Sequence, residues 1–206
     1  MLVLTGDTRC KRIVSQLQHL GWGRIWIDRP PNPWHGEQWG FDNGAYRDWM
    51  REQKFDDNAY LRRLEVAYKV GVPYLAVVPD IVAGGLHSLE LSLHWLKRLP
   101  ADWPWYFVAQ DEMTTADVEP IIERFSGVFL GGTDRFKSGA AKWCQFAHRH
   151  NKKFHYGRCG VPRKIRHAVD IGADSCDSAF FLWDTSRINE VVMVLTVPER
   201  QLKLWG

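Results

Sequence analysis

Polar side chains follow several short apolar runs of the sequence, and their types suit acid–base chemistry. The positions are Asp42, Asp80, Gln110, Asp111, the pair Gly131–Gly132, the pair Gly157–Arg158, and Asp177. Carboxylates facing one pocket permit displacement at a sugar carbon, in which one attacks as a nucleophile and another transfers a proton. An amide and a glycine backbone can read the polar edge of a purine, on which Tyr46 can stack. Each residue alone could equally serve a turn, a cap or packing, so the predicted site depends on a fold that brings them together.

Short apolar runs alternate with amphipathic stretches along the chain. We expect strands at residues 2–5, 24–27, 74–78, 105–109, 128–130, 153–156 and 175–177, with 191–196 as a candidate for an eighth. We expect helices at residues 8–20, 57–70, 86–98, 115–125, 138–150 and 163–171. Strands that alternate with helices indicate a parallel sheet, and close to eight such units favour a compact (β/α)8 barrel of the TIM type, irregular or incomplete forms included, over an open doubly wound sheet.

The chain is interpreted as one barrel domain over residues 1–206, with one departure from the regular pattern. Residues 28–56 contain Pro30, Pro31 and Pro33 and an Asp-Asn-Gly turn, so we expect a long loop on the barrel rim. In both parallel architectures ligands bind at the carboxyl ends of the strands. The polar residues that follow the strands are therefore predicted to converge there.

Basic residues are concentrated in one segment, although the formal net charge is only +3. Residues 135–167 contain ten of them and no Asp or Glu: Arg135, Lys137, Lys142, Arg149, Lys152, Lys153, Arg158, Arg163, Lys164 and Arg166. Aromatic residues are interleaved with them. Such a segment favours contact with a polyanion such as nucleic acid, while a merely solvated helix face remains the alternative.

Several function classes have no support in the sequence. The four cysteines lack CxxC spacing, which argues against a zinc site or a disulfide scaffold and fits a reducing cytoplasm. No HExxH or GxSxG motif occurs, so a metal hydrolase and a serine hydrolase are both disfavoured. No apolar run reaches the ~20 residues of a membrane span. We therefore expect a cytoplasmic protein with no metal and no cofactor.

The segment from Val161 to Ser178, VPRKIRHAVDIGADSCDS, resembles a stretch of the tRNA-guanine transglycosylases. In that family a Gly-x-Pro turn opens a helix that ends in Gly and leads into the strand of the nucleophilic Asp, and Asp177 falls on that nucleophile. The segment FDNGAY, residues 41–46, is similar to the family's Asp-Ser-Gly-Gly-aromatic motif. It implies proton transfer by Asp42, substrate contact by Asn43 and stacking by Tyr46.

Other matches imply the groups that read the base. Asp80 in Pro79-Asp80-Ile81 resembles the family's base-reading Asp, Gln110 its recognition Gln, and Gly131–Gly132 the glycine turn that meets the base through its backbone. The zinc-binding cluster of the tRNA enzymes is absent, and Gly157 or Arg158 stands where the family places a second stacking side chain. The short zinc-free form resembles the paralogues of phages and bacteria that insert 7-deazaguanine bases into DNA.

The resemblance implies a glycosyltransferase that replaces guanine in DNA through a covalent ester between Asp177 and the sugar. DNA and a free 7-deazaguanine base would be its partners, no metal or cofactor would be needed, and Arg158, Arg163, Lys164 and Arg166 would contact the nucleic acid. Three alternatives remain open: the same exchange on tRNA, an N-glycosidase that releases the base, and an inactive nucleic-acid-binding barrel.

Overall fold

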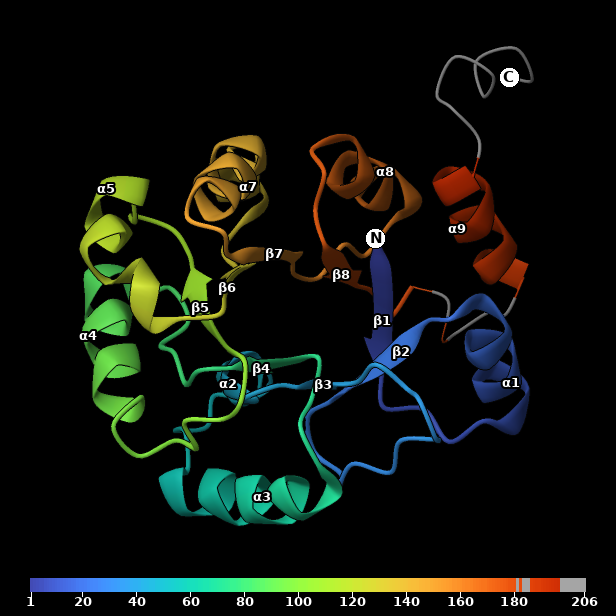
Figure 1. Ribbon diagram of the computed structural model, residues 1–206, viewed down its shortest axis with the longest axis horizontal. Coiled ribbons are helices and arrows are strands. Elements are labelled where there is room, and N and C mark those ends of the chain that lie inside the picture. The colour runs from blue at the N-terminus through green and yellow to red at the C-terminus, as the bar shows by residue number, and fades with distance from the viewer. Residues whose placement is uncertain (181, 183–185, 197–206) are drawn as a thin grey trace.

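The computed structural model describes residues 1–180, 182 and 186–196, and these form a closed barrel of eight parallel strands (Figure 1). The strands are β1 (Leu2–Gly6), β2 (Gly23–Trp26), β3 (Gly40–Phe41), β4 (Leu75–Val77), β5 (Trp105–Ala109), β6 (Gly127–Leu130), β7 (Lys153–Tyr156) and β8 (Ser175–Asp177). They follow one another in sequence order, and β8 pairs with β1 to close the barrel. The predicted (β/α)8 fold is confirmed.

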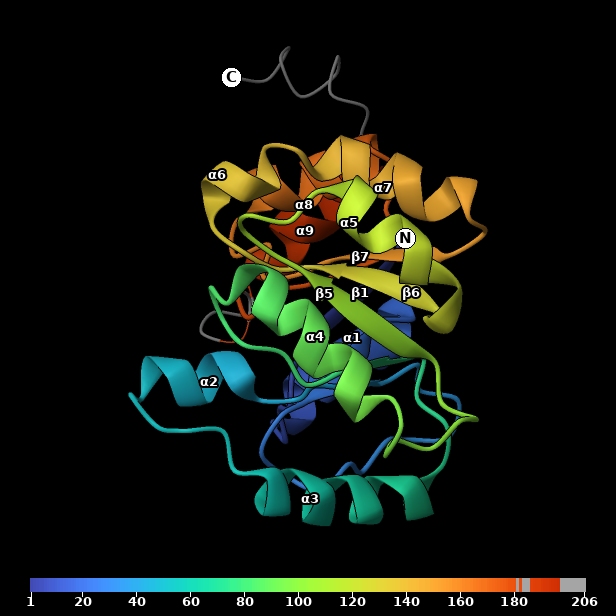
Figure 2. The same cartoon turned by 90° about the vertical axis from the view of Figure 1, so that its left-hand side faces the viewer.

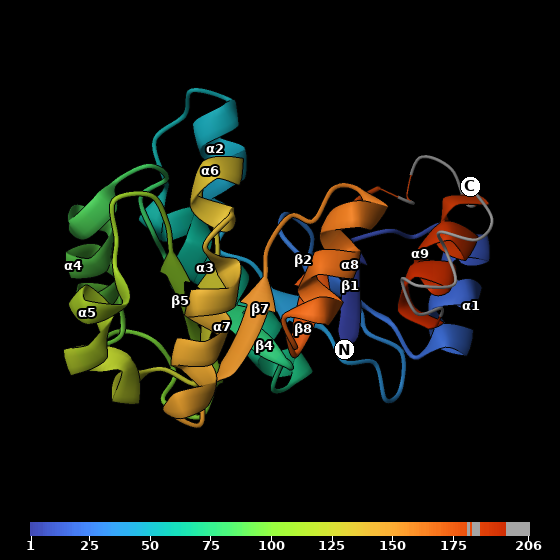
Figure 3. The same cartoon turned by 90° about the horizontal axis from the view of Figure 1, so that it is seen from above.

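Helices connect the strands and surround the barrel (Figure 1). They are α1 (Lys11–Leu20), α2 (Ala45–Met50), α3 (Asp57–Val70), α4 (Gly85–Trp95), α5 (Thr115–Val118), α6 (Asp134–Lys137), α7 (Ala140–Arg149), α8 (Pro162–Asp170) and α9 (Ser186–Thr196), with a 3-10 helix at Glu119–Arg124 after α5. The short helices α2 and α6 follow the carboxyl ends of β3 and β6, and Figures 2 and 3 show both at the same end of the barrel. They border the face where this fold binds ligands.

Alternation along the strands separates two apolar layers. The barrel interior is filled by Leu4, Ile25, Leu75, Val77, Tyr106, Val108 and Phe129. Their neighbours along each strand point outward and pack against the helices in a second, larger core. Because both faces of the sheet are covered, β5 is a continuous apolar run with every residue buried, as is typical of parallel sheets.

The eighth strand differs from the prediction. Residues 191–196 belong to helix α9, whereas the missing strand is β3, a two-residue strand inside the segment expected to be a rim loop. A short run of apolar residues fits a buried strand and a buried helix equally well, which explains the error at 191–196.

A buried ion pair holds the long connection between β2 and β3. The Nε and NH2 groups of Arg24 donate to the two carboxylate oxygens of Glu37 at 2.8 and 2.7 Å, and the guanidinium lies over the rings of Trp26 and Trp34. Both charged side chains are almost completely buried. Such a bidentate pair fixes the geometry of the connection, so that the short β3 can pair with β2.

Local signals set several helix boundaries. Thr114 and Asp117 form a reciprocal capping box at the start of α5, which confirms the helix start predicted there. Gly172 ends the turn after α8 with a φ of 80°, a conformation that glycine adopts without strain. In the described part of the chain, no helix combines the length and apolar character needed to cross a membrane.

Candidate active site

A cavity of about 430 Å³ lies at the carboxyl ends of the barrel strands. Residues at the carboxyl ends of five different strands line it together: Asp42, Asp80, Gln110, Gly131 and Asp177. Asn43, Tyr46, Asp111, Gly132 and Arg158 also line the cavity. The topology therefore brings the residues singled out in the sequence to one place, while their roles remain predictions.

Asp177, at the end of β8, is held by an imidazole and a backbone amide. Its Oδ1 atom lies 3.0 Å from His155 Nε2 and accepts a hydrogen bond of 2.9 Å from the backbone N–H of Arg158. His155 is fully buried, stacks on Phe129 at 4.5 Å between ring centroids, and lies 2.8 Å from Ser175 Oγ through Nδ1. Burial raises the pKa of Asp177, but these contacts outweigh it and hold the pKa below its usual value. Asp177 is therefore ionised near pH 7.

Asp42 follows β3, and its pKa is shifted in the opposite direction from that of Asp177. Its Oδ1 accepts a 2.6 Å hydrogen bond from the backbone N–H of Gly44, whose φ of 84° closes the turn. Burial raises the pKa of Asp42 to about 6, and the negative charge of Asp177 adds to the shift. The two carboxyl groups therefore interact electrostatically within one cavity and favour different protonation states.

Asp80, after β4, is held by two amides. Asn43 Nδ2 donates to one of its oxygens at 2.7 Å and Gln110 Nε2 to the other at 3.2 Å. Gln110 is oriented in turn by Ser88, whose Oγ accepts from the same Nε2 at 2.8 Å. Burial raises the pKa of Asp80 to about 7 despite these hydrogen bonds. Near neutral pH this group can therefore either accept or donate a hydrogen bond.

An aromatic and an arginine border the mouth of the cavity. Tyr46 on α2 is 41% exposed and stacks on Trp49 at 5.8 Å between ring centroids. The Arg158 guanidinium lies 3.7 Å from the centroid of the Tyr46 ring and donates to the carbonyl oxygen of Gly132 at 3.2 Å. Arg158 thus connects the loop after β7 with the elements after β3 and β6 across the mouth.

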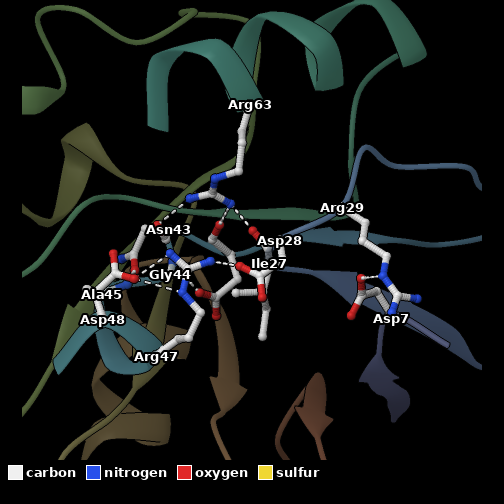
Figure 4. A network of polar contacts seen from close by, with 11 residues as sticks. Asp7, Ile27, Asp28, Arg29, Asn43, Gly44, Ala45, Arg47, Asp48 and Arg63 are labelled. Atoms are coloured by element: carbon white, nitrogen blue, oxygen red, sulfur yellow. Dashed lines mark hydrogen bonds and ion pairs between the residues drawn. The ribbon is translucent and has the colours of Figure 1, made fainter. Parts of the chain in front are cut away.

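Two further arginines fix the strand ends that carry Asp42 and α2 (Figure 4). Arg63 on α3 donates to the carbonyl oxygens of Ile27, Asp42 and Asn43. Arg47 on α2 pairs with Asp28 and Asp48. These contacts tie the ends of β2 and β3 to the neighbouring helices, and they keep the Asp42 backbone in place.

The basic side chains of residues 135–167 lie in different environments: some pair with acids, one is buried, and one lines the cavity. Three lysines pair with acids outside the segment: Lys152 with Glu123, Lys153 with Asp174, and Lys164 with Asp134. Lys137 is buried and donates to the carbonyl oxygen of Gly157, and burial lowers its pKa to about 8. Of the four residues expected to contact nucleic acid, Arg158 lines the cavity, while Arg163, Lys164 and Arg166 lie on α8 outside the lining.

Sequence reasoning missed His155, Ser175 and Ser88, which support the carboxyl groups. A signal was present for the first two, because alternation places Ser175 on the same face of β8 as Asp177, and the register pairs Ser175 with His155. Ser88 lies on α4 and carried no comparable signal. Among the described residues, no three His, Cys, Asp or Glu side chains are placed to hold a metal ion.

Comparisons with known proteins give the fold but no family. No protein-family model matches the chain, and no curated protein sequence matches it. One similar solved structure is an HpcH/HpaI aldolase from Desulfitobacterium hafniense DCB-2, with 12% sequence identity, a TM-score of 0.51, and coverage of 96% of this chain and 94% of that chain. At this identity the likeness shows a shared barrel fold and nothing finer.

This finding corrects the transglycosylase interpretation. The predictions of that family, of a glycosyltransferase, and of DNA base exchange with a 7-deazaguanine were wrong, because the solved neighbour is an aldolase and no family model supports them. The three alternatives depended on the same interpretation and are wrong with it: base exchange on tRNA, base release, and an inactive nucleic-acid-binding barrel. The matching carboxylates, amide and glycines lie at or just after the carboxyl ends of barrel strands. Carboxylates and glycines at these positions belong to the ligand face of the fold in many enzymes, so they do not identify one family.

Proposed function

We propose that this protein is an acid–base enzyme of the lyase type, acting on a small hydroxylated carbonyl compound. One observation carries the proposal: a single cavity contains carboxyl groups whose surroundings shift their pKa values in opposite directions, with Asp177 below its usual value and Asp42 at about 6. Environments that separate the pKa values of neighbouring groups assign the acid and the base. Asp177 is then the base, and Asp42 the acid.

The proposed reaction is a retro-aldol cleavage. Asp177 takes the proton from the hydroxyl group on the β carbon of the carbonyl compound, and the bond between the α and β carbons breaks. Its electron pair forms the double bond of the enol, while the π pair of the carbonyl moves onto the carbonyl oxygen. Asp42 gives its proton to that oxygen. The products are an aldehyde or ketone and an enol, and the two carboxyl groups now have exchanged protonation states. Protonated Asp177 then gives its proton to the α carbon of the enol while Asp42 takes back the proton of the enol oxygen, so that a second carbonyl compound is formed and both carboxyl groups return to their starting states. In the reverse of this last step Asp177 removes a proton from the α carbon and Asp42 protonates the carbonyl oxygen.

The charge of the cavity limits the substrate class. Three carboxyl groups, Asp42, Asp80 and Asp177, and the amide of Gln110 present mainly hydrogen-bond acceptors. A carboxylate on the reacting part of the substrate would be repelled by the ionised Asp177, whereas hydroxyl or amino groups would be bound. We therefore assign the recognition of such donors to Asp80 and Gln110. The aldolase that shares the barrel fold supports the lyase class.

Proton exchange at carbon tests this proposal directly. The protein is incubated in D₂O with dihydroxyacetone, glyceraldehyde, erythrulose and aminoacetone, and ¹H NMR follows the loss of protons next to the carbonyl. Enolisation in the cavity should exchange these protons, and Asp177→Asn should slow the exchange by about 10²–10⁴-fold, the usual contribution of a general base. The control Asp170→Asn changes an exposed carboxylate on α8 and should have no effect.

Two outcomes would contradict the proposal. If none of the four compounds exchanges faster than in buffer alone, the assigned substrate class is wrong. If Asp177→Asn exchanges a compound as fast as the unmodified protein does, the assigned base is wrong.

A further inference from the structure

A second cavity of about 560 Å³ adjoins the first. It lies between the loop after β5 and the helices α6 and α7, and Asp111 lines both cavities. A ligand whose reacting part occupies the first cavity can therefore extend past Asp111 into the second. None of the residues assigned to the proposed acid–base step lines this second cavity.

Two cations line this second cavity, Arg135 on α6 and Lys142 in the first turn of α7. Both are exposed, and neither side chain forms an ion pair or a hydrogen bond with a residue that the structure describes. They differ in this from Lys152, Lys153 and Lys164 of the same basic segment, which all pair with acids. Arg135 and Lys142 are thus available to an external anion.

The two acids of the second cavity are directed elsewhere. Both oxygens of Asp111 accept hydrogen bonds from Thr133, one from its hydroxyl and one from its backbone N–H. The carboxylate of Glu112 lies against Gly85 at the start of α4, with Oε2 2.8 Å from the position that a Cβ on Gly85 would occupy. Neither acid therefore forms an ion pair with Arg135 or Lys142, although the charge of Arg135 contributes to the lowered pKa of Asp111.

The floor of the second cavity is apolar. Met113 and Trp143 are buried beneath it, and the ring of Phe136 lies 5.9 Å from that of Trp143 between centroids. Cations above an apolar floor suit an anionic group attached to a carbon skeleton better than a free inorganic ion. Arginine and lysine both bind phosphate groups by charge-assisted hydrogen bonds.

We propose that the second cavity binds the phosphate group of a small phosphorylated substrate, with Arg135 and Lys142 as its ligands. The residues that line the second cavity are sufficient to support phosphate binding there. That the phosphate belongs to the substrate whose hydroxylated carbonyl end reacts beside Asp177 rests on the proposed function. Two cations in a cavity match one phosphate group, whereas a nucleic-acid strand is bound by a longer series of phosphate contacts. The substrate class is thereby narrowed to a hydroxylated carbonyl compound with a distal phosphate.

Calorimetric titration with glycerol 3-phosphate, and with glycerol as the neutral probe, tests the site without turnover. Glycerol 3-phosphate should bind and glycerol should not, and Arg135→Gln and Lys142→Gln should each weaken binding about 10-fold, as expected for one charge-assisted hydrogen bond. Arg149→Gln is the matched control, because Arg149 is exposed at the opposite end of the helix that carries Lys142. Failure of glycerol 3-phosphate to bind, or equal weakening by Arg149→Gln, would overturn the proposal.

A second arm separates a small phosphate from nucleic acid. A single-stranded DNA oligonucleotide is titrated at several salt concentrations. If it binds more than 10-fold more tightly than glycerol 3-phosphate, and Arg135→Gln and Lys142→Gln each reduce its salt dependence by about one phosphate contact, the cavity is a nucleic-acid site and the proposal is wrong. Weaker oligonucleotide binding that the two variants leave unchanged supports it.

The outcome for the site is distinguishable from the outcome for the proposed function. Asp177→Asn should retain full affinity for glycerol 3-phosphate while losing proton exchange. If glycerol 3-phosphate binds as proposed but no carbonyl compound exchanges, the phosphate site stands and the lyase assignment fails. If proton exchange occurs but Arg135→Gln leaves the affinity for glycerol 3-phosphate unchanged, the lyase assignment stands and the phosphate site is wrong.

Discussion

Replacing Asp80 by Asn should make the protein more stable at alkaline pH. Asp80 is held in a site that raises its pKa from 3.8 to about 7. The folded protein therefore keeps a proton on this group up to about pH 7, whereas the unfolded chain releases it near pH 4. Because the folded state binds more protons in this window, stability falls as pH rises from about 4 to about 7. The Asn variant carries no charge and escapes this loss.

The size of the effect follows from the shift. A shift of about three pKa units corresponds to roughly 4 kcal/mol, at about 1.4 kcal/mol per unit, as an upper limit. An amide at position 80 can accept from only one of the two amide donors, Asn43 and Gln110, so the lost hydrogen bond costs about 1 kcal/mol. We expect Asp80→Asn to be about 2–3 kcal/mol more stable at pH 8, or roughly 5–10 °C in Tm for a chain of this size, and about 1 kcal/mol less stable at pH 4.

Calorimetric or urea unfolding at pH 4 and pH 8 measures the stability difference between the Asp80→Asn variant and the unmodified protein, which should change sign between the two pH values. Asp111→Asn is the opposite control. Hydrogen bonds from Thr133 outweigh burial and hold the pKa of Asp111 below its usual value, so that variant should lose stability at pH 8 and lose less near pH 3. An Asp80→Asn protein that is no more stable than the unmodified protein at pH 8, or equally changed at both pH values, would refute the reasoning.

Three further predictions concern the acid, its partner and the packing behind the site. kcat/KM for the cleavage direction should fall above about pH 6, where Asp42 loses its proton, and Asp42→Asn should abolish this limb; an unchanged limb in that variant would exclude Asp42 as the acid. His155→Asn should raise the pKa of Asp177 and move the acidic limb of kcat/KM upward with little change in KM, whereas an unmoved limb would indicate that His155 only fills space. Gly157→Ala should destabilise the protein by about 1–3 kcal/mol in urea unfolding, because its Cβ would lie 2.4 Å from a ring carbon of Phe129; neutral behaviour would contradict the packing described.

The sequence was sufficient to predict the barrel and the convergence of several polar residues at the carboxyl ends of its strands. Three strands, residues 105–109, 153–156 and 175–177, were predicted with the bounds that the structure shows, because each is a short segment between two predicted helices. β3 was missed because two residues carry no periodicity, and its position depends on the remote pair of Arg24 and Glu37. The convergence of Asp42, Asp80 and Asp177 followed from topology alone.

The supporting contacts and the family could not be predicted in the same way. The acids that pair with Lys152 and Lys153 lie 29 and 21 residues away in the sequence, so a local count of charges overstated the exposed cationic surface. The motifs around Asp177 and Asp42 reflect a ligand face common to barrel enzymes, and they suggested a family that the comparisons do not support. The opposite pKa shifts that carry the proposed function depend on burial and on His155, and these emerge only in three dimensions.

A titration of the individual carboxyl groups tests the central claim most directly. With ¹³C-labelled aspartate, and with Asp42→Asn, Asp80→Asn and Asp177→Asn to assign the signals, NMR should show Asp80 titrating near pH 7, Asp42 near pH 6, and Asp177 below the usual value of 3.8. If all three carboxyl groups titrate together near pH 4, the cavity does not separate an acid from a base, and the proposed enzyme chemistry is contradicted.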